Sequence, residues 1–383
     1  MKKILLLLGI VILGNPAMIF GYTQMDSSEK WHDEDKGLRT KITAGIAQMY
    51  DTNITYVHHD RLDDFMTNLS MGVDMNYHSK TDDFNLQTQV TQQFFASHHD
   101  FENISEDLTL DYKKELSEYN RLRLNNTYVH TDEPRSFQDA FGRSAGRYQY
   151  YLNRFSGEYV QEFYKQFSGL VKYSNEFYSP RRQDIAGSVQ NKMGVELDYA
   201  PDTDTVFLTA FDYANREFHP GHAINAEEVT LGIKQFITKQ LQLETRVGAD
   251  FLSHNDRDVT EPEFFLSLTN PIFKTAEVGF TFIKKHDSNA FTEDIFDFWQ
   301  VSWSLSKHIL KRLKVAATHF YGDGEYSISN DKETFQGVRL GLFYTFAEQW
   351  LGNITYSYED VDSNNTDREY VKNTIYMGLR WEF

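Results

Sequence analysis

The chain alternates hydrophobic and polar side chains over most of its length. The alternation is plainest in the last residues, 369–383, where Val371, Ile375, Met377, Leu379, Trp381 and Phe383 share one parity and Lys372, Thr374, Tyr376, Gly378, Arg380 and Glu382 share the other. Successive side chains of a β-strand point to opposite faces, so this segment predicts a strand with one apolar and one polar face. Its aromatic end is typical of a strand that reaches a membrane interface.

The same period predicts about eighteen strands, with sixteen as the alternative count. They cover 38–50, 63–78, 82–98, 103–116, 118–131, 146–165, 167–179, 186–200, 204–216, 226–238, 240–252, 260–269, 274–287, 295–306, 312–321, 334–347, 350–361 and 369–383. From the second strand onward, short and long connections alternate. Outer-membrane barrels have short periplasmic turns and longer external loops, and an even strand number keeps this order.

Strand length separates a membrane barrel from a soluble sandwich. A β-sandwich shows the same alternation, but its strands are usually about five or six residues long, whereas tilted membrane strands need about nine to eleven. The predicted fold is therefore an all-β, antiparallel, up-and-down transmembrane barrel over residues 38–383. The longest connection, 132–145, is expected to fold into it.

Composition agrees with an exported membrane barrel. Lys2, Lys3 and the apolar run 4–13 predict a signal peptide over 1–21, followed by a polar leader over 22–37. Aromatic residues make up 15% of the chain, yet the mean hydropathy is −0.56, as expected when half of each strand faces water. The chain has no cysteine, which excludes disulfides and thiolate metal sites. No cofactor is predicted. The net charge of −18 argues against nucleic acid as a partner.

A resemblance to a known family supports the same prediction. The segment Ala44–Ile54 (AGIAQMYDTNI), with its Tyr-Asp-x-Asn turn, and the ending YMGLRWEF resemble β-barrel porins associated with exopolysaccharide systems. The resemblance covers the whole mature chain and implies an outer-membrane pore, with secreted polysaccharide as one cargo. It assigns no role to single residues.

Charged residues of the polar parity are the candidates for the pore wall. They are Arg121, Arg123, Arg154, Lys172, Lys192, Arg246, Arg312, Lys314, Arg339, Arg380, Glu158, Glu196, Asp198, Glu244 and Asp250. One interpretation is that opposite charges pair across neighbouring strands and keep the lumen wet. The other is a basic export channel for an anionic polymer, for which Arg121 with Arg123, and Arg312 with Lys314, would have to converge.

Three further patterns have weaker functional interpretations. Residues 360–366 place oxygen ligands at alternate positions, as a calcium loop does, but lack its glycine and its final glutamate. The repeated triplets His58-His59-Asp60 and His98-His99-Asp100 could bind zinc or act as acid and base, but polar rim segments are the favoured interpretation. The aromatic residues are assigned to interface girdles rather than to sugar stacking.

The sequence therefore predicts a passive pore in the bacterial outer membrane and not an enzyme, with no metal or catalytic residues. Expected partners are outer-membrane lipid and lipopolysaccharide, the barrel-assembly machinery through the strand ending in Phe383, and polysaccharide. A plugged structural or adhesion barrel with acidic external loops, and a surface enzyme, are the alternatives.

Overall fold

The computed structural model describes residues 37–133, 147–183, 185–219, 221–238, 240–254, 257–273, 276–288 and 294–383. These residues form an 18-stranded antiparallel sheet, together with one short 3-10 segment, η2 (His99–Phe101). Its first nine strands are β1 (Gly37–Asp51), β2 (Asp64–His78), β3 (Asp82–Phe95), β4 (Asn103–Glu115), β5 (Asn120–Thr131), β6 (Tyr150–Tyr164), β7 (Phe167–Pro180), β8 (Gly187–Tyr199) and β9 (Thr205–His219). The remaining nine are β10 (Ala223–Phe236), β11 (Gln242–His254), β12 (Arg257–Phe273), β13 (Ala276–Ser288), β14 (Ile295–Leu310), β15 (Leu313–Tyr326), β16 (Lys332–Ala347), β17 (Trp350–Ser363) and β18 (Tyr370–Glu382). In this part of the chain no helix is both long and apolar enough to span a membrane.

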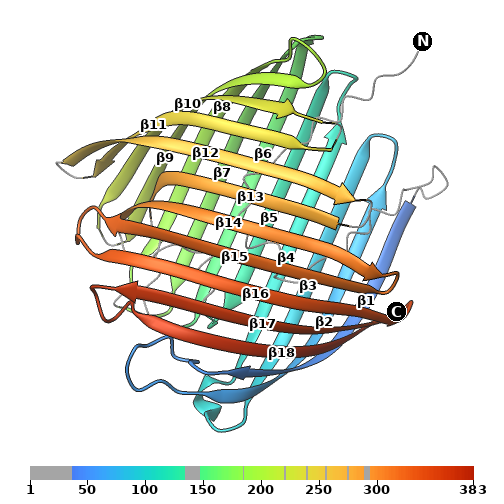
Figure 1. Cartoon of the computed structure of the whole chain (residues 1–383), viewed down its shortest axis with the longest axis vertical. Coiled ribbons are helices and arrows are strands. Elements are labelled where there is room, and N and C mark those ends of the chain that lie inside the picture. The colour runs from blue at the N-terminus through green and yellow to red at the C-terminus, as the bar shows by residue number, and fades with distance from the viewer. Residues whose placement is uncertain are drawn as a thin grey trace.

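The sheet closes on itself into a barrel. Each strand pairs with the next in sequence, and β1 also pairs with β18 from Thr43↔Glu382 to Asp51↔Thr374. Figure 1 shows the red C-terminal strand lying beside the blue N-terminal one. Closure satisfies the backbone hydrogen bonds that an open sheet edge would leave unpaired, which lipid would not tolerate. The predicted up-and-down barrel and its eighteen strands are confirmed, and the count of sixteen is wrong.

The outer face of the barrel is apolar. Large hydrophobic side chains of one parity remain exposed around the wall, for example Met193 at 59%, Leu231 at 58% and Val247 at 50%. The opposite parity carries the charged and amide side chains and faces the interior. A soluble sheet protein would bury the apolar face, so this arrangement requires lipid around the barrel. The chain is a transmembrane barrel of the bacterial outer membrane. The predicted signal peptide and all but the last residue of the leader lie outside the described residues.

Several strands are longer than the hydrophobic pattern predicts. β9 continues to His219 and β10 begins at Ala223, so the predicted long loop between them is reduced to residues 220–222. The predicted loop 322–333 likewise shrinks because β15 runs on to Tyr326. The hydropathy period stops at the membrane edge, but backbone pairing continues wherever two polar strand extensions lie side by side.

Buried apolar clusters lie inside the barrel rather than between layers. The largest, here called the aromatic cluster, consists of Tyr56, Phe296, Phe298, Phe320, Tyr326, Phe335, Val361 and Tyr370. Its strand members have the parity of the interior, not of the lipid face. At Gly337 a side chain would collide with the ring of Phe320, so glycine on one strand makes room for the ring on its neighbour. The predicted assignment of aromatic residues to interface girdles therefore does not hold for this group.

Candidate functional site in the barrel lumen

Ion pairs line the lumenal face of β4 to β7. Arg123 Nη2 lies 2.6 Å from Asp111 Oδ2, and Arg121 Nη2 lies 3.0 Å from Glu162 Oε1. Arg154 pairs with Glu176 on the neighbouring strand at 2.5 Å. Because both Arg121 and Arg123 have acidic partners, the two do not form the unpaired basic patch that a polyanion channel would need.

The ionic ladder continues from β7 to β11. Lys172 Nζ lies 2.9 Å from Asp212 Oδ2, and Lys192 Nζ lies 3.0 Å from Glu228 Oε2. Arg246 bridges two acids, with 2.9 Å to Glu196 and 2.8 Å to Glu244. Such pairs add little net stability, because desolvation offsets their attraction, but they hold the wall hydrated and fix neighbouring side chains.

The strands place nearly all predicted wall residues on the interior face. Along each strand these residues occupy the positions between the lipid-facing side chains. They are Arg121, Arg123, Arg154, Lys172, Lys192, Arg246, Lys314, Arg339, Arg380, Glu158, Glu196, Asp198, Glu244 and Asp250. Arg312 is the exception. It lies exposed in the turn before β15 and donates to the carbonyl of Phe346. The predicted Arg312–Lys314 pair is thus split between turn and wall, because β15 begins only at Leu313.

A second sector of the lumen is neutral and polar. A cavity of about 430 Å³ is bounded by β1 to β5 and β16 to β18. Amide and hydroxyl side chains dominate its interior lining: Thr43, Asn68, Ser70, Gln89, Thr91, Gln93, Ser105, Thr131, Asn353, Thr355, Ser357 and Thr374. Four charged side chains also line it, two of each sign: Asp107, Glu133, Arg339 and Arg380. Hydroxyls and amides both donate and accept hydrogen bonds, so this sector suits uncharged, hydrogen-bonding solutes.

The first external loop, residues 52–63, folds into the mouth of the barrel. Ile54 and Asn53 are fully buried, and Tyr56 is 4% exposed. Ile54 packs with Met66 and Phe95 of the wall, and Asn53 Nδ2 donates to the carbonyl of Val371 across the closure of the barrel. The longer connection that was predicted to fold inward, 132–145, lies largely outside the described residues.

Contacts among four residues hold this loop in place, and we call these residues the mouth cluster: Tyr56 of the loop and the charged residues Glu133, Arg147 and Lys372. Tyr56 Oη donates to Glu133 Oε1 at 3.0 Å, and Lys372 Nζ lies 3.6 Å from the centre of the Tyr56 ring. Arg147, whose side chain is 2% exposed, pairs with Glu133 and donates from Nε to the carbonyl of Ile54 at 3.2 Å. Tyr56 has a φ of 56°, a conformation that a bulky residue adopts only when its surroundings enforce it.

The pKa values of the two carboxyl groups beside Arg147, those of Glu133 and Asp132, are shifted in opposite directions. Burial by itself would raise the pKa of Glu133, but the positive charges of Arg147 and Lys372 bring that pKa below its ordinary value. Burial raises the pKa of Asp132 to about 6, against the opposing charge of Arg147. Glu133 is therefore the permanent anion of the mouth, whereas Asp132 titrates near neutral pH.

The weaker sequence motifs do not assemble into sites. His58 pairs with Glu369 at 2.6 Å, and His98 pairs with Asp64 at 3.0 Å. Neither triplet belongs to a metal-ligating group among the described residues. Residues 360–366, whose oxygen ligands alternate as in a calcium loop, are strand up to Ser363, with Val361 buried in the aromatic cluster. Its alternate carboxylates are consequently held along a strand and not around an ion.

Two features of the site were missed by sequence reasoning. Phe296 and Phe298 share parity with Gln300 on β14, so their place on the interior face was readable from the alternation. The inward fold of residues 52–63 had a weaker signal: Ile54, Val57 and Leu62 are apolar residues in an otherwise polar loop. Neither signal shows which distant wall the side chain would meet.

No family model matches the chain, and no curated protein matches it in sequence. Solved structures with a similar shape include OccK2 (OpdF) of Pseudomonas aeruginosa, at 8% identity and a TM-score of 0.49, covering 90% of this chain and 97% of that one. OccAB4 of Acinetobacter baumannii has 9% identity and a TM-score of 0.48, covering 90% and 98%. OpdK of Pseudomonas aeruginosa, an outer membrane protein, has 10% identity and a TM-score of 0.47, covering 90% and 98%. Similarities as distant as these do not indicate a substrate.

Proposed function

We propose that this protein is a passive outer-membrane channel for small, uncharged, hydroxylated solutes of the saccharide class. The observation that carries the proposal is the neutral cavity inside a closed, lipid-exposed barrel. Its amide and hydroxyl groups, such as Asn68, Gln89 and Gln93, offer the hydrogen bonds that a sugar gives up when it leaves water. The proposal assigns no chemical reaction to the chain.

The charged sector of the lumen supports a preference against anions. Its bases pair with acids, as Lys172 does with Asp212, and Glu228, Asp250 and Glu263 add a cluster of carboxylates, so the wall presents no basic surface to attract an anionic solute. This favours saccharide diffusion over export of an acidic polymer. Export of a neutral polysaccharide would require residues 52–63 to leave the mouth.

One specific observation favours a second function, a plugged structural barrel. Ile54 and Asn53 are fully buried, and the aromatic cluster occupies the same end of the lumen. If the mouth stays closed, no solute passes and the acidic external loops carry the function. For the barrel to act as a channel, the contacts of the mouth cluster therefore have to break and let residues 52–63 move aside.

Solute flux distinguishes the two functions. The purified barrel is placed in liposomes, and swelling is recorded with a neutral disaccharide and with a sugar acid of similar size. We expect faster swelling with the neutral sugar, and slower swelling after the paired change Asn68→Leu and Gln93→Leu, which keeps side-chain size but removes hydrogen bonds. Thr67→Val on the lipid face is the matched control and should leave flux unchanged. Absence of swelling with both sugars would support the plugged barrel instead.

Two partners belong to the same proposal. The saccharide class agrees with the exopolysaccharide systems that the sequence resemblance suggests, with the solute as a unit or fragment of such a polymer. The barrel-assembly machinery is the second partner, through β18. Because β18 has to pair with both β17 and β1, its correct placement closes the barrel, which supports recognition of this strand during insertion.

A further inference from the structure

The barrel wall has an open seam between β12 and β13 near the external end. Their ladder of paired residues begins at Phe264↔Lys284 and runs toward the periplasmic turn, although both strands continue outward beyond it. Continuing the register would place Pro262 opposite His286. Proline has no N–H to donate to a ladder, which gives a reason why pairing stops here. Side chains, not backbone hydrogen bonds, must join the wall above this point.

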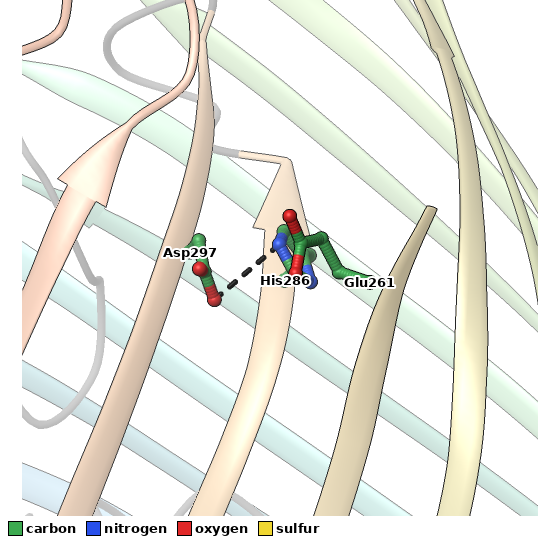
Figure 2. Close-up of side chains that lie close together, drawn as sticks. All are labelled: Glu261, His286 and Asp297. Atoms are coloured by element: carbon green, nitrogen blue, oxygen red, sulfur yellow. Dashed lines mark ion pairs between the residues drawn. The ribbon is translucent and has the colours of Figure 1, made fainter. Parts of the chain in front are cut away.

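Three potential metal ligands meet at this seam. Glu261 comes from β12, His286 from β13 and Asp297 from β14, and their ligand atoms all lie within 4.8 Å of one another. Figure 2 shows the three side chains directed toward one another across the strands. One histidine nitrogen with two carboxylates is a donor set typical of zinc and of related divalent transition metals.

The histidine itself points to a ligand. His286 is 8% exposed, and neither ring nitrogen forms a hydrogen bond. Buried polar atoms without hydrogen bonds are uncommon and need an explanation. Its Nε2 lies 3.3 Å from Asp297 Oδ1. Two ligands bound at about 2.0–2.1 Å around a tetrahedral zinc ion are separated by about 3.3 Å, so this spacing suits a shared ion.

A carboxylate lies near the other ring nitrogen. Nδ1 is 4.0 Å from Asp250 Oδ2, which is longer than a hydrogen bond. A histidine that binds metal through one nitrogen usually directs the other toward a carboxylate, which fixes the ring and its tautomer. Lys284 also faces the group, with Nζ 2.9 Å and 3.0 Å from the two oxygens of Asp297. Each carboxylate oxygen keeps a further lone pair, so Lys284 can stay bound while the ion is held.

We propose that Glu261, His286 and Asp297 bind a divalent transition metal ion of the zinc class, which clips β12 to β13 and β14 where the backbone ladder is open. The ion replaces the missing strand pairing at the external rim and holds the wall closed there. This site is independent of solute passage, since its residues do not line the neutral cavity.

The test is metal binding to the refolded mature barrel in detergent. After treatment with a chelator, the protein is titrated with Zn²⁺ and its metal content is measured. We expect one tightly bound equivalent that His286→Ala removes and that Glu261→Gln weakens at least tenfold. His308→Ala, an exposed histidine at the periplasmic end of β14, is the matched control and should bind as the wild type does. Zn²⁺ should also raise the urea midpoint of the wild type and not that of His286→Ala.

Several outcomes would overturn the proposal. Binding that survives in His286→Ala with unchanged affinity excludes the site, as does the absence of a stoichiometric equivalent in the wild type. Loss of zinc in His58→Ala but not in His286→Ala would assign the ion to the external loop instead. Folding of each variant is checked by its heat-dependent gel shift. If His286→Ala does not fold, Asp297→Asn takes its place, and wild-type affinity in that variant refutes the clip.

Discussion

Truncation of Tyr56 is the sharpest test of the closed mouth. Tyr56 is the point at which the first external loop meets both the aromatic cluster and the charged residues of the opposite wall. In Tyr56→Ala the Cβ remains, so the backbone strain at φ 56° persists and only the contacts of the side chain are lost. The change therefore measures what those contacts contribute to keeping the loop inside.

The magnitude follows from three contacts. Burial of the ring contributes about 2 kcal/mol, from the usual value for an aromatic side chain that is removed from water. The hydrogen bond to the carboxylate of Glu133 contributes about 1.5 kcal/mol, and the contact with the ammonium group of Lys372 about 1 kcal/mol. These contributions are not additive, so we expect the closed mouth to lose about 3 kcal/mol, which corresponds to a roughly hundredfold change in the ratio of closed to open forms.

Single-channel recording in planar bilayers measures that ratio. We expect Tyr56→Ala to spend far more time in the open state than the wild type, and Tyr56→Phe, which keeps the ring but not the hydroxyl, to lie between them. Tyr213→Ala is the matched control, because this tyrosine is on the lipid face and donates to Asn225 at 3.1 Å. If Tyr56→Ala folds and its conductance and dwell times equal those of the wild type, the loop does not limit passage and the reasoning fails.

Three further predictions test other parts of the structure. Burial raises the pKa of Asp132 from 3.8 to about 6 when the mouth is closed, so protonation of Asp132 between these pH values favours the closed form. Conductance should therefore fall from pH 7 to pH 5. Asp132→Asn should abolish that fall. Gly194→Ala would bring a methyl group against Asp212 and Lys172, and should lower the free energy of unfolding by about 1–3 kcal/mol, seen as a lower urea midpoint. Leu231→Arg places a charge on the lipid face at a cost of about 2–4 kcal/mol, and should reduce the fraction that folds into vesicles; equal folding would contradict the outward assignment.

The barrel wall is the part that the sequence specifies. Each strand exposes one face to lipid and one to water, so apolar and polar residues alternate along it. In β11, for example, Leu243, Val247 and Phe251 are apolar and Glu244 and Arg246 are charged. Strand number, order and interior face follow from this local rule together with the alternation of turns and loops. Pairing of opposite charges on adjacent strands follows as well, since neighbours in sequence are neighbours in the sheet.

The interior of the mouth was decided only by the tertiary structure. Tyr56 and Lys372 are at opposite ends of the sequence and meet because β1 pairs with β18 around a closed barrel. The inward fold of residues 52–63 depends on a pocket formed by several distant strands, and the apolar residues of the loop do not show which of these strands they meet. The open seam at His286 was also decided by the tertiary structure. Pro262 marks in the sequence where the ladder stops, but the curvature of the barrel determines which side chains meet across the gap. Local alternation fixes the faces of each strand, whereas contacts across the lumen are set by the shape of the whole barrel.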